Sequence, residues 1–288
     1  GKKVVLAQNS PSHYFLLNIL LNGGVQPSEV KLKFTGDAFQ AAAAFNQDKS
    51  IAACVSWAPD IYNLTKPGMG NKILISTGTA NKLIADVWYA RADFARDNPE
   101  IIEGILNAVE DLKGDTNRPM VADMMDDFYG LPKGTAKDML ADAHWTNYAE
   151  NKDFFLNQNN PTNFERTYTT AFLLYKAIRS VDQKVPFDQI MDFSVIKKLG
   201  ADPKFAAQTN DYEYKFTPVS NLEVNVESAI LTKTVTIQFF PNSNDLFKKV
   251  TGTGGQETFY DPNVQNTVEE IAKLAGQFGA ARIQISGH

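Results

Sequence analysis

The sequence predicts an α/β protein in three parts: a parallel sheet flanked by helices over residues 1–113, a helical segment with a connector over 114–222, and a small α+β unit over 223–288. Three observations support this prediction. In the first part, apolar strand patterns alternate with helix patterns, which is typical of a parallel sheet covered by helices. Helical patterns dominate the second part. In the third, the period-two alternation of a strand returns beside one amphipathic helix.

The first part begins with a short apolar strand, KKVVLAQ, at residues 2–8. Ser10 can cap the next helix, Pro11 suits its first position, and Gly23 can end it. That helix is apolar nearly all round, so we expect it to be buried. The elements expected after it are a half-buried strand at 30–36, an alanine-rich helix capped by Asp37, a strand buried on both faces at 51–57, strands at 72–77 and 84–90, and a helix that starts at 98–100.

In the second part, helices are expected within 135–145 and 163–181. Thr162 and Glu165 have the spacing of a capping box. Residues 201–222 are polar and rich in turn formers, which predicts a connector. The elements expected in the third part are a strand at 233–240, a flexible Gly/Thr-rich loop at 241–263, a helix from an Asp261 cap to a stop at Gly279, and a strand at 281–288.

Composition excludes several function classes. The net charge of −5 and the pI of about 5.3 argue against a nucleic-acid partner. The single cysteine, Cys54, lies in an apolar strand pattern and is interpreted as a small core residue. The three histidines are too widely spaced for a metal motif of the HExxH kind, and we expect neither a metal nor a cofactor. No apolar run reaches membrane-spanning length. The chain opens on a strand without a signal peptide, so we expect a mature or trimmed chain.

The sequence NSPSHY places polar groups at the start of an apolar helix. A helix N-terminus presents unpaired N–H groups and a partial positive charge. Ser10 and Ser12 add hydroxyl donors, and His13 adds a ring nitrogen. In open α/β sheets, ligands bind at the carboxyl edge to which a strand delivers such a helix end. This pattern predicts a cradle for a carboxylate, sulfonate, nitrate or phosphate. A plain capped helix with a hydrogen-bonded His13 explains the same residues.

Further polar and aromatic residues follow other predicted strands near the same edge. Trp57 ends the strand at 51–57, and Asp60 follows a proline that blocks its continuation. Trp57 can form a flat pocket wall with Asp60 as a polar partner, or it can be a core residue at a turn. Ser76 and Asp86 lie in the next two strand patterns. Together these residues favour a small-molecule site.

The order of these segments resembles the second lobe of extracytoplasmic solute-binding proteins, over residues 1–200. The matching features are the strand followed by a Ser-rich helix start, the segment from Ala52 to Pro59 and the segment from Arg91 to Glu100. The most similar group is the nitrate, sulfonate and taurine type of ABC-transporter receptor, which is related to thiamine-precursor binders.

This resemblance implies a periplasmic-binding-protein-like lobe in a two-lobed clamp, with a small anionic or amphoteric solute between the lobes and a possible ABC permease as partner. It also implies that Ser10, Ser12 and His13 grip the ligand, that Trp57 and Asp60 line the cleft, and that a first lobe is missing from these 288 residues.

The tail resembles a different family, the OmpA-like peptidoglycan-associated domain. The matching segments are 235–246, 260–279 and 281–288. The resemblance is to part of that domain, because the family's wall-binding acid and arginine follow the point where this chain stops. Together the two resemblances imply a periplasmic or extracytoplasmic receptor, associated with the cell envelope and attached to peptidoglycan through the complete C-terminal domain.

Two alternatives to a non-enzymatic receptor remain open. One is an enzyme on the thiamine-precursor type of scaffold, because a fold does not fix a function. The sequence shows no obvious pair of base and nucleophile for it. The other is an envelope scaffold that binds a protein and no small ligand.

Overall fold

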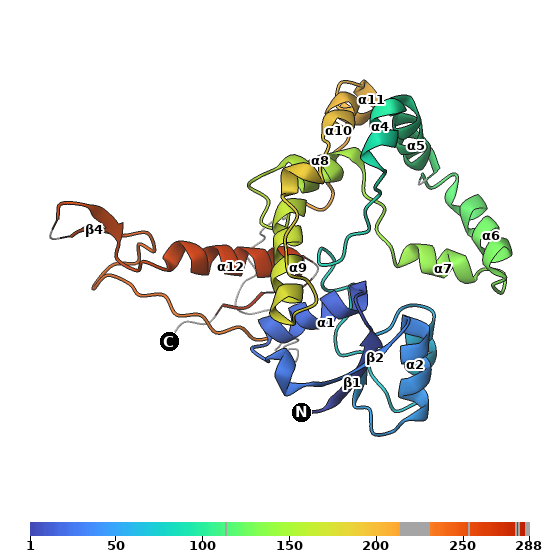
Figure 1. Ribbon diagram of the computed structural model, residues 1–288, viewed down its shortest axis with the longest axis horizontal. Helices are drawn as coiled ribbons and strands as arrows, with labels where there is room; N and C mark the ends of the chain where they lie inside the picture. Colours follow the sequence, from blue (N-terminus) through green and yellow to red (C-terminus); the bar gives the residue numbers. More distant parts are fainter. Residues whose placement is uncertain (113, 214–230, 253, 280, 282, 286–288) are drawn as a thin grey trace, which may run out of the picture.

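The computed structural model describes all residues except 113, 214–230, 253, 280, 282 and 286–288. The first part contains a parallel sheet of three strands in the order β2-β1-β3, shown with its helices in Figure 1. Its elements are β1 (Lys3–Ala7), α1 (Pro11–Asn22), the short 3-10 helix η1 (Pro27–Glu29), β2 (Lys31–Thr35), α2 (Ala38–Gln47) and β3 (Ala53–Cys54). In the register, Val4 of β1 lies opposite Leu32 of β2 and Ala53 of β3.

The central strand is the most buried part of this sheet. Val5 and Leu6 have no exposed surface, and Val5 packs with Ala41 of α2 and with Ile51. The short alanine side chains of α2 allow its backbone to approach the sheet closely. The predicted alternation of strands and helices is therefore confirmed up to β3.

The prediction of a longer third strand and of two further strands is wrong. Only Ala53 and Cys54 of the expected strand at 51–57 pair with a neighbour, and both are half-buried. No strand is described at 72–77 or 84–90. Leu74 and Trp88 are more than half exposed there. A strand needs a partner for its N–H and C=O groups, and among the described residues β3 has only β1 as a neighbour.

The middle of the chain is helical, as predicted. The helices and 3-10 helix from Asp60 onward are α3 (Asp60–Leu64), α4 (Ala92–Asp97), α5 (Pro99–Leu112), α6 (Arg118–Tyr129), α7 (Thr135–Ala141), α8 (Tyr148–Leu156), α9 (Phe164–Ala177), η2 (Phe187–Gln189), α10 (Ser194–Leu199) and α11 (Pro203–Ala206). The cap of α9 differs from the prediction, since Asn163 and not Thr162 accepts the N–H of Arg166. The predicted connector at 201–222 contains α11, and residues 214–222 lie outside the described residues.

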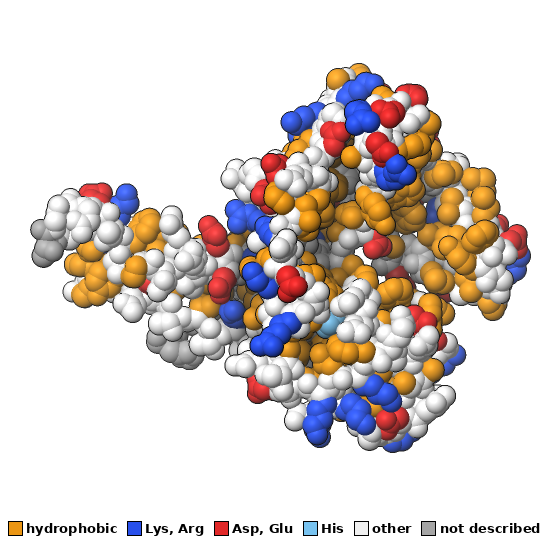
Figure 2. All heavy atoms as spheres, in the orientation of Figure 1, with side chains coloured by type: hydrophobic (Ala, Val, Ile, Leu, Met, Phe, Trp, Pro, Cys, Tyr) orange, Lys and Arg blue, Asp and Glu red, His pale blue; other side chains and the backbone are white. Residues whose placement is uncertain are grey.

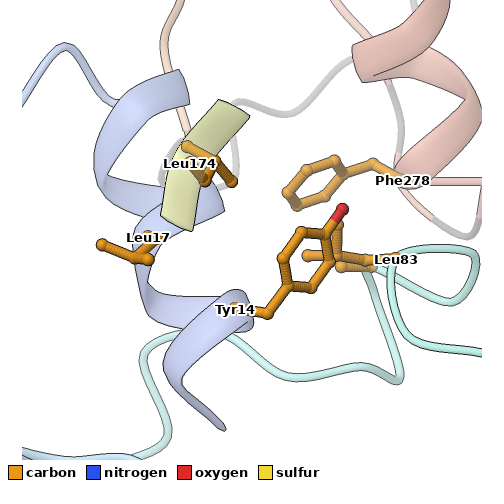
Figure 3. Close-up of a cluster of buried hydrophobic side chains, with 6 residues drawn as sticks. Tyr14, Leu17, Leu83, Leu174 and Phe278 are labelled. Atoms are coloured by element: carbon orange, nitrogen blue, oxygen red, sulfur yellow. The ribbon is translucent and has the colours of Figure 1, made fainter. Parts of the chain in front are cut away.

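Three clusters of buried residues join these helices. The largest links α1, the loop at 80–83, α9 and the end of α12 (Val264–Gln277), and Figure 3 shows the rings of Tyr14 and Phe278 beside Leu83. A second joins α8, α10 and α11 through Tyr148, Leu199 and Phe205. A third lies between α6 and α7 and uses only residues of that hairpin and its turn. α6 and α7 therefore form an arm (Figure 1) with its own small core.

The C-terminal part differs most from the prediction. The segment 233–240 forms no strand, and neither do the described residues 281 and 283–285 of the expected final strand; its other residues are not described. The expected flexible loop instead contains an antiparallel hairpin of β4 (Lys249–Thr251) and β5 (Glu257–Phe259). Asp261 does not cap α12, which begins after Asn263; its carboxylate accepts the N–H groups of Gln238 and Asn263.

The molecule is open in shape. Its accessible surface is 19737 Å², whereas a compact monomer of 31.9 kDa exposes roughly 12,000 Å². Figure 2 shows a hollow between the α6–α7 arm and the α/β part, with apolar side chains around it. Among the described helices, none combines the length and the apolar character that crossing a membrane requires.

Candidate functional site

The N-terminus of α1 is built by a tight turn at the carboxyl end of β1. Asn9 has a φ of 50°, a left-handed conformation that asparagine adopts more easily than most residues. Ser10 then caps the helix: its Oγ accepts the N–H of His13 at 3.4 Å and donates to the carbonyl of Ala7 at 2.9 Å. Ser10 therefore has a structural role, because its hydroxyl is occupied on both sides.

Ser12 and Trp57 meet at this helix end. The indole Nε1–H of Trp57 donates to Oγ of Ser12 at 2.9 Å. An indole can only donate, so the serine oxygen is the acceptor and its own hydrogen stays available for another partner. The backbone N–H of Ser12, in the first turn of α1, has no acceptor among the described residues. Ser12 thus offers two donors beside the positive end of the helix.

Trp57 is held in place from several sides. The preceding residue, Ser56, donates its hydroxyl to the carbonyl of Ala38 at 2.9 Å, which ties the end of β3 to α2. The Trp57 ring meets Phe39 edge-on, with centroids 6.5 Å apart. Its carbonyl accepts the N–H of Ile61 in α3 at 3.1 Å. The residue is nevertheless 44% exposed, so part of it is accessible to solvent.

His13 lies beneath the helix end and has no exposed surface. Its Nδ1 accepts the N–H of Asn9 at 3.3 Å, so the hydrogen of the neutral ring is on Nε2. That Nε2 has no partner among the described residues. Phe34 and Tyr175 meet the ring edge-on. Burial lowers the pKa of His13, which favours the neutral ring at pH 7. His13 is therefore enclosed, and no part of it is exposed to solvent in this structure.

The other predicted site residues lie farther along the chain. Asp60 is half-buried in the first turn of α3, three residues after Trp57. Ser76 is half-buried and its Oγ accepts the N–H of Gly78 at 3.2 Å, while Asp86 is exposed. No contact recorded between described residues links Ser76 or Asp86 to Ser12. The structure therefore joins Ser12 with Trp57 and places Asp60 three residues after Trp57, in the next helix. It shows no contact of Ser76 or Asp86 with this pair.

Cys54 ends β3 close to Asp60. Burial, with the Asp60 charge as a smaller cause, raises the pKa of the Cys54 thiol to about 11. At neutral pH the group is a thiol, which is a poor nucleophile. This agrees with its interpretation as a packing residue.

Two residues near the site were not predicted from the sequence. The hydroxyl of Tyr175, in α9, donates to the carbonyl of Ser10 at 3.2 Å and its ring covers His13. Phe39 supports Trp57. Tyr175 is 165 positions from Ser10, and its helix pattern carries no signal for that contact. Phe39 lies in α2, and the sequence gives no signal that its ring contacts Trp57.

Two open hollows on the described surface lie away from this helix end. One, of about 380 Å³, is lined by residues 90–98. The other, of about 330 Å³, lies between 110–118, 144–150 and 204–211. Neither is lined by Ser12 or Trp57, so the candidate site is a hydrogen-bonded pair at a helix end and not an enclosed pocket.

Comparisons with known proteins give one partial match. No family model matches the chain. The taurine-binding periplasmic protein of Escherichia coli (strain K12) is 30% identical over 114 residues, which cover 38% of this chain and 34% of the relative. The match thus spans about a third of the relative's length. The similarity is distant, and the relative is by its name a taurine-binding protein of the periplasm.

Proposed function

We propose that this chain is part of an extracytoplasmic solute-binding receptor, and that the N-terminus of α1 holds the anionic group of a small solute. The observation that carries the proposal is the hydrogen bond between Trp57 and Ser12 at the end of the helix. It brings together three hydrogen-bond donors that one anionic group can use: the hydroxyl and backbone N–H of Ser12 and the indole N–H of Trp57. The partial match to a taurine-binding periplasmic protein supports the same function.

The geometry suggests how such a group binds. Ser12 is only 2% exposed and is covered by Trp57. An anionic oxygen that enters here accepts hydrogen bonds from the indole N–H and from the Ser12 hydroxyl, and so replaces the bond between those two groups. Hydrogen bonds to a charged acceptor are stronger than the neutral bond that is lost. The helix end adds a favourable partial charge.

Asp60 suggests the solute class within this proposal. A carboxylate three residues after Trp57 suits the positive group of an amphoteric solute whose negative group lies at Ser12. Taurine, an aminosulfonate, has both groups, so it is the first probe for this site. Ser76 and Asp86 have no contact with the pair in this structure, and they have a part in this proposal only if a clamp motion brings them to the solute.

The test is calorimetric titration of taurine into the wild type, Ser12→Ala and Ser28→Ala. Ser28 is an exposed serine on η1 and serves as the matched control. We expect Ser12→Ala to weaken binding about tenfold, the effect of losing one hydrogen bond to a charged group, while Ser28→Ala binds like the wild type. Alanine is well tolerated in a helix, and the exposed Trp57 can donate to water.

Two results would count against the receptor. One is equal affinity of the wild type and Ser12→Ala for taurine. The other is the absence of thermal stabilisation by taurine, nitrate, bicarbonate, phosphate or amino acids, because a ligand at a hundred times its Kd adds about 2.7 kcal/mol to the free energy of unfolding.

An ABC permease partner and attachment to peptidoglycan stay predictions from the resemblances of the sequence. The absence of the expected strand at 233–240 removes one structural support for an OmpA-like unit. Co-sedimentation of the chain with purified peptidoglycan tests the attachment, and a chain truncated before residue 233 is the comparison.

A further inference from the structure

The hollow of about 330 Å³ is a second candidate site, separate from the end of α1. It lies where α5, α8 and α11 meet. Hydrogen bonds between the segments shape its walls: Tyr148 N–H donates to Gln208 at 2.6 Å, Gln208 Nε2 donates to Glu110 at 3.2 Å, and Asn147 Nδ2 donates to the carbonyl of Thr209 at 2.8 Å. Because these bonds join positions about 60 and 98 residues apart, the folded helices fix the hollow.

Glu150 is the unusual group in this hollow. Its side chain is only 4% exposed. One carboxylate oxygen, Oε2, lies 2.8 Å from Nε2 of His144 and accepts the N–H of Asn147 at 2.9 Å. The other oxygen, Oε1, is buried without a partner among the described residues. A buried carboxylate oxygen without a hydrogen-bond donor is costly, so this position favours a donor. Oε1 is not accessible to solvent in this structure, so an occupant of the hollow reaches it only when a neighbouring side chain moves aside.

The surroundings favour a positively charged occupant. The lining contains four carboxylates and two permanently charged cations: Glu110, Asp115, Glu150 and Asp211, with Arg118 and Lys204. Of those cations, Lys204 donates to Asp111 at 2.6 Å and is already neutralised. Glu110 has a further contact, and the Glu150 charge also acts on Lys82, whose pKa is lowered by burial and raised in part by this charge. The excess of negative charge therefore rests mainly on Asp115, Glu150 and Asp211. Trp145 is also in the wall and is 40% exposed. An aromatic face attracts a cation.

We propose that this hollow binds the primary ammonium group of a small organic amine, with Glu150 Oε1 accepting one N–H and the Trp145 ring contacting the alkyl chain and the charge. A primary ammonium supplies the donor that Oε1 lacks and the charge that the carboxylates favour. A quaternary ammonium has the charge but no donor, so it should bind less well. This proposal does not depend on the receptor function proposed above, because it uses none of the residues at the end of α1.

The probe is propylammonium chloride, titrated into the full chain labelled with 5-fluorotryptophan. The chain has three tryptophans, and Trp145→Phe identifies the 19F resonance of Trp145. We expect a saturable shift of that resonance, and a smaller effect of tetramethylammonium at the same concentration. Sodium chloride at equal ionic strength is the reference.

The decisive variant is Glu150→Gln. Glutamine also serves at the third position of a capping box, so α8 keeps its cap while the charge is lost. We expect propylammonium affinity to fall about tenfold or more, with a melting temperature within about 3 °C of the wild type. Asp138→Asn removes the same charge from an exposed site on α7 and should bind propylammonium like the wild type.

Three results would overturn the proposal. They are a shift no larger than that caused by sodium chloride, equal affinity of Glu150→Gln and the wild type, and equal affinity for propylammonium and tetramethylammonium. If Glu150→Gln fails to fold, Trp145→Leu at this partly exposed position replaces it and should weaken binding, read from the heat of titration.

Discussion

At the scale of single residues, the candidate site depends on which hydrogens remain available. Ser10 uses its hydroxyl to cap α1, whereas Ser12 accepts from Trp57 and keeps its own hydrogen. Two serines that look alike in the sequence therefore have different roles. Only Ser12 has donors left for a guest, which is why the proposed function rests on it.

His13 gives a pH dependence of stability. Its pKa is lowered by burial, so the unfolded chain takes up a proton at pH values where the folded chain does not. The free energy of unfolding should therefore fall as the pH is lowered below the unfolded pKa of about 6.5. We expect His13→Phe to lose less stability than the wild type between pH 7 and 5.5, measured by urea denaturation.

The comparison variant is His144→Gln, which changes a histidine that is partly exposed. We expect its free energy of unfolding to fall as much as that of the wild type between pH 7 and 5.5, because His13 is unchanged. A wild-type stability that does not change between pH 7 and 5.5, or a loss of the same size in His13→Phe, would show that His13 is not buried as a neutral ring.

At the scale of elements, α1 joins the sheet to the rest of the molecule. Its N-terminus meets Trp57, and its buried face packs on the loop at 80–83, on α9 and on the end of α12 (Figure 3). A helix fixed on several sides can hold its N-terminus in a constant position. The candidate site at the N-terminus of α1 therefore depends on this packing.

Leu17 and Leu21 provide a matched test on that helix. Leu17 is 1% exposed and Leu21 is 54% exposed. Leu17→Ala leaves a cavity in the largest core cluster, and we expect it to lower the free energy of unfolding by about 2–4 kcal/mol. Leu21→Ala should change it by about 0.5 kcal/mol or less. Chemical denaturation measures both, and equal losses would contradict the packing described here.

The sequence predicts elements well where their signals are local. The caps at Ser10 and Asp37, the stop at Gly23 and the strand β1 follow from turn chemistry and apolar patterns. The segments 72–77, 84–90 and 233–240 have strand-like patterns but form no strands, because a strand exists only where another strand accepts its hydrogen bonds. That partner is a property of the whole fold.

The same distinction applies to the site. The capped helix start after β1 follows from the sequence, whereas the sequence pattern places Trp57 at the end of a strand that in the structure ends at Cys54. The contact of Tyr175 with Ser10 and the position of Ser76 could not be predicted. They depend on how distant helices and loops pack.

At the scale of the whole molecule, the large surface is the main feature. On α6, Met120, Met124 and Phe128 follow one another at a spacing of four and are 48%, 64% and 82% exposed. They form an apolar stripe on the outside of the α6–α7 arm. The core of the arm contains only residues of α6, α7 and their turn, so the arm extends from the body.

This open shape can be measured by small-angle X-ray scattering. A compact protein of 288 residues has a radius of gyration of about 19 Å. We expect a clearly larger value for this chain at low concentration. A value close to 19 Å would show that the arm and the C-terminal hairpin fold back onto the body and cover the apolar stripe.

The central claim is that an anionic solute accepts hydrogen bonds from Trp57 and Ser12. The most direct measurement is a 15N–1H spectrum of the three tryptophan indole groups during a titration with taurine, with Trp57→Phe used for assignment. The account predicts a saturable downfield shift of the Trp57 indole proton, as its acceptor changes from a hydroxyl to a charged oxygen, and predicts that Ser12→Ala needs about tenfold more taurine to reach half of its own shift. A Trp57 indole signal that stays in place while taurine binds would contradict it.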